Sequence, residues 1–144
     1  MVIQIGFMQG RLSPMINGKI QSFPKDNWQK EFKLANSLDL QIMEWTIDYD
    51  ANYINPLLLK QEQKEIINLS KKYSVKTKSL TGDCFMQKPF WKEKILDKRE
   101  KLINYMKEIF YASNKVGIEL IVIPLVDNGS IENAQQEEIL VESL

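Results

Sequence analysis

The chain contains no histidine and a single cysteine, Cys84. Without histidine there is no Ser-His-Asp triad, no Cys-His pair and no His-containing zinc helix, so any acid–base chemistry belongs to carboxylates or lysines. One cysteine forms neither an internal disulfide nor a thiolate metal cluster, and no basic residue of imidazole type activates it as a nucleophile. This cysteine usage is typical of a reducing compartment, and we expect a cytoplasmic protein.

Long apolar runs and an excess of one charge are also missing. The longest unbroken apolar run covers residues 120–126, which is far too short to cross a bilayer. The N-terminus lacks the charged region of a signal peptide. Lys plus Arg total 19 and Asp plus Glu total 19, so no overall positive field attracts nucleic acid or an anionic membrane. We expect no nucleic-acid partner and no membrane.

The composition that remains is that of a folded domain. The chain has 144 residues, of which 44% are hydrophobic and 26% charged, which is too apolar for a disordered chain. This length suits one compact domain with a substantial core. We therefore treat residues 1–144 as a single domain.

Strand-like and helix-like patterns alternate four times along the chain. Short apolar segments typical of buried strands cover residues 2–8, 40–47, 75–81 and 118–126. Amphipathic segments follow each of them: 27–38, a helix with Ile66, Leu69 and Tyr73 on one face, a long helix from Ile95 to Val116, and a last helix through Leu144. We expect Asp26 and Ser130 to cap the first and last helices, and Gly117 to end the longest one.

This alternation predicts an α/β fold with parallel strands and right-handed crossovers. Two architectures fit: an open doubly wound sheet with helices on both faces, or half of an eight-unit barrel with helices on one face. Two observations favour the barrel. No Gly-rich phosphate-binding motif follows the first strand, and polar residues stand at the end of every strand.

These polar residues are our candidate ligand-binding residues. They are Gln9 and Arg11 after the first strand, Glu44 in the second, Asp83 after the third and Asp127 after the fourth. In parallel α/β folds the carboxyl ends of the strands meet at the edge where ligands bind. Several carboxylates at that edge suit a polyol or a divalent cation.

The same residues lie in segments that carry a family likeness. These segments are IGFMQGRLSP, IQSFP, IMEWTID, NPLL, GDCFM and IPLVDNGS. Together they resemble the N-terminal half of the sugar phosphate isomerase/epimerase family, which belongs to the xylose-isomerase-like TIM-barrel superfamily. The likeness runs through nearly the whole chain. Two positions depart from it, because Asp39 and Ser74 stand at helix ends where the family commonly has glycine.

The resemblance implies a TIM (β/α)8 barrel that binds a divalent metal ion and a small sugar or sugar phosphate. The reaction would be isomerisation or epimerisation next to a carbonyl. The main metal ligands and proton-transferring residues would come from strands five to eight, beyond this chain, so these residues alone would be inactive. The substrate-side residues that match are Gln9, Arg11, Glu44, Trp45, Asp83 and Asp127. Asp83 and Asp127 follow strands after which the endonuclease IV-type relatives place histidines, which argues against that branch.

A simpler interpretation stands beside each of these residues. For Glu44 it is an ion pair with a lysine or with Arg11, which is one of two arginines. For Asp83 it is the organisation of a turn, and for Asp127 it is a helix cap. For Trp45 it is burial under a helix, since neighbouring strand residues point to opposite faces.

The length leaves two further alternatives open. A full barrel needs about 200 residues or more, so the chain supplies about half of one. A non-catalytic half-barrel would have open strand edges through which it could pair with a second copy or another chain. An open flavodoxin-like binding module is the third possibility.

Overall fold

The computed structural model describes residues 3–16, 18–19 and 22–144. Within these ranges four parallel strands form one sheet: β1 (Gly6–Met8), β2 (Ile42–Thr46), β3 (Lys76–Thr81) and β4 (Leu120–Val122). The α-helices are α1 (Trp28–Ser37), α2 (Lys60–Tyr73), α3 (Asp83–Gln87), α4 (Leu96–Val116) and α5 (Ala134–Ser143). Three 3-10 turns complete the described elements: η1 (Pro56–Leu58), η2 (Phe90–Lys92) and η3 (Asp127–Gly129). The predicted α/β class with a parallel sheet is confirmed.

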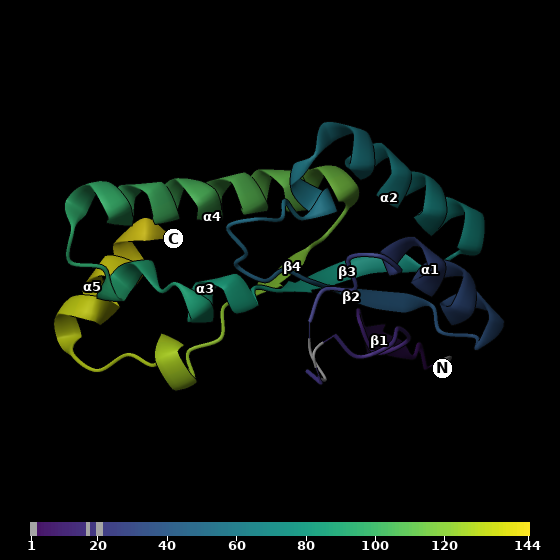
Figure 1. The fold of residues 1–144 in the computed structure, drawn as a ribbon, viewed down its shortest axis with the longest axis horizontal. Helices are drawn as coiled ribbons and strands as arrows, with labels where there is room; N and C mark the ends of the chain where they lie inside the picture. Colours follow the sequence, from purple (N-terminus) through teal and green to yellow (C-terminus); the bar gives the residue numbers. More distant parts are fainter. Residues whose placement is uncertain (1–2, 17, 20–21) are drawn as a thin grey trace.

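The strands are ordered β1-β2-β3-β4, so neighbours in the sheet are also neighbours in the sequence. In flavodoxin-like and Rossmann sheets the order in which the strands are added reverses at a switch point. The order of the described strands shows no such reversal. Helices α1, α2 and α4 lie along one side of the sheet, while α3 and α5 lie beyond its end (Figure 1). The sheet is therefore compatible with half of an α/β barrel and differs in order from a flavodoxin-like one.

The hydrophobic core lies between the sheet and these three helices. Met43 and Trp45 of β2 are completely buried there, as is Leu80 of β3. The helices contribute large side chains to the same layer, including Trp28, Phe32, Ile66, Met106 and Ile109. On β4, by contrast, Leu120 is 68% exposed and Val122 is 45% exposed. We call the sheet face left uncovered by α1, α2 and α4 the open face.

Three helix-end residues adopt left-handed backbone conformations. Gly117 ends α4 at φ 86°, as the sequence predicts. Asp39 follows α1 at φ 57° and Ser74 ends α2 at φ 55°. Glycine adopts this region freely, whereas a Cβ makes it unfavourable. Asp39 and Ser74 therefore carry backbone strain.

Both predicted N-caps, Asp26 and Ser130, are wrong. α1 begins one residue later than expected, with Asn27 at its N-cap and no capping bond from that side chain. α5 is capped by Asn133, whose Oδ1 accepts a hydrogen bond of 3.0 Å from the Gln136 N–H. Ser130 closes η3 instead, because its N–H donates to the Asp127 carbonyl at 3.2 Å. The backbone is extended at Asn133, so α5 starts only at Ala134.

The outer strands are shorter than predicted. β1 covers Gly6–Met8 of the expected 2–8, although residue 2 lies outside the described residues. β4 covers Leu120–Val122 of the expected 118–126 and ends just before Pro124, which has no N–H to donate to a ladder. None of the helices in the described ranges combines the length and the apolar character needed to cross a membrane.

Replacing Ser74 with glycine should stabilise the protein. The substitution relieves left-handed strain of about 1–2 kcal/mol. Against this gain, glycine loses more conformational entropy on folding, which costs about 0.5–1 kcal/mol. We expect a net gain of about 0.5–1 kcal/mol in the free energy of unfolding, measured by urea denaturation. Ser70→Gly, inside α2, is the matched control and should lower stability. Equal losses at both positions would contradict the strain at Ser74.

Candidate functional site

The loop after β1 is held by a buried carboxylate from α1. Glu31 is only 1% exposed, and both of its carboxylate oxygens accept from the Gly10 N–H at 3.0 Å. Its Oε1 also accepts from the Leu12 N–H at 3.1 Å and from the Ser13 hydroxyl at 2.9 Å. These donors compensate for much of the cost of burying a charge. Glu31 therefore sets the path of the loop that carries Arg11.

Sequence reasoning missed Glu31, although a signal was present. It lies on the same helical stripe as Trp28, Phe32 and Ala35, all of which are buried. An acid on an apolar stripe needs hydrogen-bond donors from elsewhere in the chain. Burial raises the pKa of the Glu31 carboxyl, and the hydrogen bonds from Gly10, Ser13 and Leu12 oppose this rise.

Gly10 and Arg11 occupy the first turn of this loop. Gly10 has φ 92°, and a Cβ there would lie 2.5 Å from the Ser22 carbonyl oxygen, so only glycine fits. Arg11 is exposed. Within the described residues Arg11 forms no ion pair with Glu44, so the suggested pairing is absent.

Gln9 closes the end of β1 against β2. Its N–H donates to the Glu44 carbonyl at 2.9 Å, and its side-chain Oε1 accepts from the Thr46 N–H at 3.2 Å. The side chain thus continues the strand ladder where the backbone turns away at Gly10. Gln9 is completely buried, and its Nε2 has no hydrogen-bond partner among the described residues.

Glu44 lies on the open face, between the buried Met43 and Trp45, and a bulge in β3 keeps a lysine from pairing beside it. Met43 pairs with Thr77, but Glu44 pairs with Ser79, so Lys78 is an extra residue in the ladder. A regular register would place Lys78 beside Glu44. Lys78 instead forms an ion pair with Glu119. The half-buried Glu44 accepts through Oε1 from the Thr81 hydroxyl at 2.7 Å, and its predicted lysine ion pair is absent from the described residues.

Asp83 lies at the carboxyl edge of the sheet, at the start of α3. The flanking backbone anchors it there, since the Gly82 N–H donates to the Val122 carbonyl and the Cys84 N–H to the Ile47 carbonyl, both at 3.0 Å. Asp83 is 7% exposed. Cys84 is buried beside it, and this burial raises the pKa of the thiol, so Cys84 behaves as a small hydrophobic residue.

Trp45 and Asp127 lie apart from this group. The Trp45 ring is completely buried against Phe23 and Trp28, and its Nε1 donates to Asn55 Oδ1 at 3.1 Å. It therefore belongs to the core, as the simpler interpretation states. Asp127 is exposed at the start of η3, with φ 50°, and does not cap α5. Of the six candidates, Gln9, Arg11, Glu44 and Asp83 thus lie in the carboxyl half of the sheet or in the turns that directly follow its strands.

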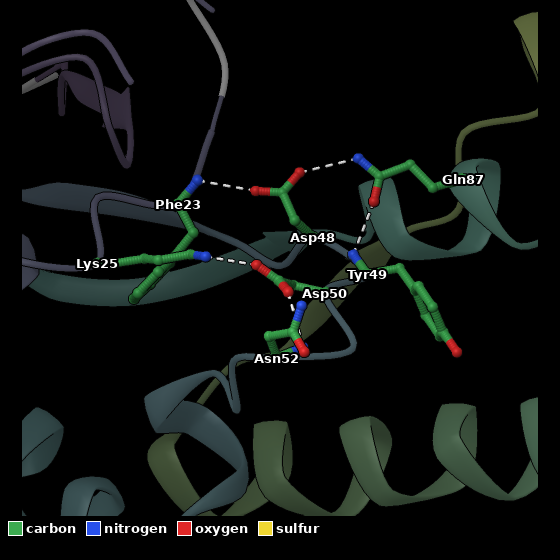
Figure 2. A network of polar contacts seen from close by, with 7 residues as sticks. All are labelled: Phe23, Lys25, Asp48, Tyr49, Asp50, Asn52 and Gln87. Carbon is green, nitrogen blue, oxygen red and sulfur yellow. Dashed lines mark hydrogen bonds and ion pairs between the residues drawn. The ribbon is translucent and has the colours of Figure 1, made fainter. Parts of the chain in front are cut away.

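Asp48 is a second residue that sequence reasoning missed. Its Oδ2 accepts from the Phe23 N–H and its Oδ1 from Gln87 Nε2, both at 2.9 Å (Figure 2). Gln87 Oε1 in turn accepts from the Tyr49 N–H at 2.7 Å. Asp48, in the loop after β2, therefore connects the loop after β1 with the end of α3. Its position directly after the predicted strand 40–47 was the available signal.

The described residues do not form a metal site by themselves. No group of three or more His, Cys, Asp or Glu side chains in these ranges is arranged to hold a metal ion. Comparison of the chain with models of known protein families and with curated proteins gives no match.

The buried Glu31 should make stability depend on pH in a defined direction. Its raised folded-state pKa means that the native state binds the proton more readily than the unfolded state does. This contribution is fully present below the unfolded pKa and is lost as the pH rises through the folded pKa. We expect the unfolding free energy of wild type minus that of Glu31→Gln to be larger at about pH 4 than at about pH 7.

Urea denaturation of both proteins at the two pH values measures this difference. Gln29→Ala, an exposed change on the same helix without a titrating group, should differ from wild type equally at both pH values. If the unfolding free energy of wild type minus that of Glu31→Gln instead increases with pH, hydrogen bonding to the charged carboxylate outweighs its burial.

Proposed function

We propose that residues 1–144 form half of a barrel of the sugar phosphate isomerase/epimerase type, with the open face contributing the substrate-binding side of the site. The observation that carries this proposal is Glu44, a half-buried carboxylate on the open face that no lysine neutralises among the described residues. In a barrel that face lines the interior, where ligands are bound at the carboxyl ends of the strands.

The contacts of Glu44 suit a hydroxyl-rich ligand. Oε1 already accepts from Thr81, whereas Oε2 accepts no hydrogen bond within the described residues. An ionised carboxylate is an acceptor only, so a sugar hydroxyl is a natural donor to the remaining oxygen. Ser79, which pairs with Glu44 across the ladder, offers a further hydroxyl on the same face.

Arg11 supports a phosphorylated substrate. Its guanidinium is exposed, it stands in the turn that Glu31 pins, and a guanidinium binds phosphate through two parallel hydrogen bonds. In this proposal Arg11 holds the phosphate and Glu44 orients the hydroxyl groups of the sugar.

Proton transfer next to a carbonyl also needs a base and a group that polarises the carbonyl. The described carboxylates form no group that holds a metal ion, so a divalent metal would have to be bound by residues outside this set. Binding and orientation are the parts of the reaction that we assign to this chain. Residues 1–144 alone are then inactive.

The test is carried out on the protein in the form that its cell produces. We would incubate it in D₂O with aldoses, ketoses and their phosphates, with Mg²⁺, Mn²⁺ or Co²⁺, and follow deuterium incorporation next to the carbonyl by NMR. Glu44→Gln should lower kcat/KM by about tenfold or more, as expected for a lost hydrogen bond to a charged group. Glu65→Gln, an exposed change on α2, should leave the rate unchanged. No exchange with any sugar, or an unchanged rate in Glu44→Gln, would contradict the proposal.

A second candidate function is favoured by the exposed residues of β4. β1 and β4 are the two edge strands, and Leu120 and Val122 on β4 are exposed. Two copies related by a twofold axis would pair β4 of each with β1 of the other and cover these side chains. In this alternative the half-barrel is a self-associating, non-catalytic protein.

Light scattering of the 144-residue chain tests self-association. A dimer has twice the mass of the 16.8 kDa chain, and Val122→Lys should shift it towards the monomer because a charge would then be buried at the new interface. Lys107→Glu, an exposed change on α4, is the control and should leave the mass unchanged. A monomer at all concentrations would rule out this second function.

A further inference from the structure

A cleft of about 480 Å³ lies away from the open face. It is bounded by the loop after β2, the connection between α3 and α4, and the N-terminal half of α4. Its volume is within the range of about 300–1,000 Å³ that is usual for small-molecule sites. None of the six candidate residues discussed above lines it.

Aromatic side chains form the walls of the cleft. Tyr49 and Tyr53 come from the loop after β2, and Tyr105 comes from α4. The rings of Tyr49 and Tyr105 meet edge to face, with centroids 6.2 Å apart. Leu102 and Leu58 add aliphatic surface. These walls suit a flat ring, because aromatic pairs gain from edge and face contacts beyond simple burial.

The charged groups of the cleft are mainly positive. Lys88, Lys98 and Lys101 line it, and none of them takes part in an ion pair among the described residues. Of the two acids present, Asp50 is paired with Lys25, which lowers the pKa of that carboxyl. Glu93 already accepts from the Ile95 N–H at 3.0 Å. The lining of the cleft therefore has three lysines outside any described ion pair and two acids that already have partners.

The loop that carries Tyr49 and Tyr53 is fixed before any ligand arrives. Asp48 accepts hydrogen bonds from the Phe23 N–H and the Gln87 amide, and Gln87 accepts one from the Tyr49 N–H (Figure 2).

The stretch that leads to Tyr53 is held by its own contacts. Asp50 Oδ1 accepts from the Asn52 N–H at 2.9 Å. The Lys25 ammonium lies 4.6 Å from the centre of the Tyr53 ring. A wall fixed in this way loses little conformational freedom on binding, which favours affinity.

We propose that this cleft binds a small organic phosphate that carries a flat aromatic ring. The ring contacts Tyr49 and Tyr105, and the phosphate lies against Lys98 and Lys101 on α4. Phosphate suits these residues better than a single negative charge, because several ammonium groups can share its two charges and its oxygens. The site is separate from Glu44 and does not depend on the reaction proposed for the open face.

Isothermal titration with 1-naphthyl phosphate tests the proposal. Wild type should bind it in a saturable manner, more tightly than it binds 1-naphthol or inorganic phosphate alone. The double variant Lys98→Gln/Lys101→Gln should bind at least about tenfold more weakly, because hydrogen bonds to charged groups are lost. Tyr49→Ala should also weaken binding, and added salt should weaken it in wild type.

Two controls separate this site from general charge and from the open face. Lys64→Gln/Lys107→Gln removes the same charge at exposed positions outside the cleft and should leave the affinity unchanged. Glu44→Gln should also bind the probe as wild type does. Three results would each overturn the proposal: no saturable binding, an equal loss in both double variants, or inorganic phosphate binding as tightly as the naphthyl ester.

Discussion

Burial of Trp45 determines the orientation of the rest of the sheet. The indole contacts Phe23 from the loop after β1 and Trp28 from α1, and it donates to Asn55 just before η1. Two stretches of chain, one before β2 and one after it, are thereby packed on one ring. Since neighbouring strand residues point to opposite faces, a Trp45 buried under the helices directs Glu44 to the open face. The hydrophobic layer and the candidate site are thus two results of one orientation.

Two buried or half-buried acids organise the loops above this layer. Glu31 holds the turn after β1, and Asp48, in the loop after β2, connects the loop after β1 with the end of α3. A hydrogen-bond network whose members are satisfied selects one arrangement of the backbone, since any other arrangement leaves a charge unpartnered. These acids therefore hold the loops in one arrangement, as the aromatic side chains hold the sheet and helices.

The sequence was sufficient for the larger features of the fold. Apolar periodicity indicated the four strands and the helices α1, α2, α4 and α5, but not the short α3, and glycine at position 117 correctly marked the end of α4. The caps failed because Asp26, Asn27, Ser130 and Asn133 are all suitable residue types, and only the path of the chain selects among them. The ends of the outer strands depended on pairing, which local pattern does not contain.

The candidate site was only partly predictable for a similar reason. Residues that follow strands could be identified: Gln9 does contact Glu44, and Asp83 lies at the carboxyl edge of the sheet. The bulge at Lys78 could not be predicted from regular alternation. Alternation puts residues three positions apart on opposite faces, whereas Thr77 and Leu80 are both buried. Asp48 and Glu31 were overlooked because their hydrogen-bond donors come from distant parts of the chain, up to 39 positions away in the case of Gln87 and Asp48.

The parallel order of the sheet also has an electrostatic consequence. Each of α1, α2 and α4 runs back against the strand that precedes it, so its first turn lies towards the carboxyl ends of the strands. Peptide dipoles aligned along these helices place partial positive charge at that end and partial negative charge at the other. A chain with a net charge of zero is therefore polarised along its strands, and it favours anions at the end where Arg11 and Lys98 lie.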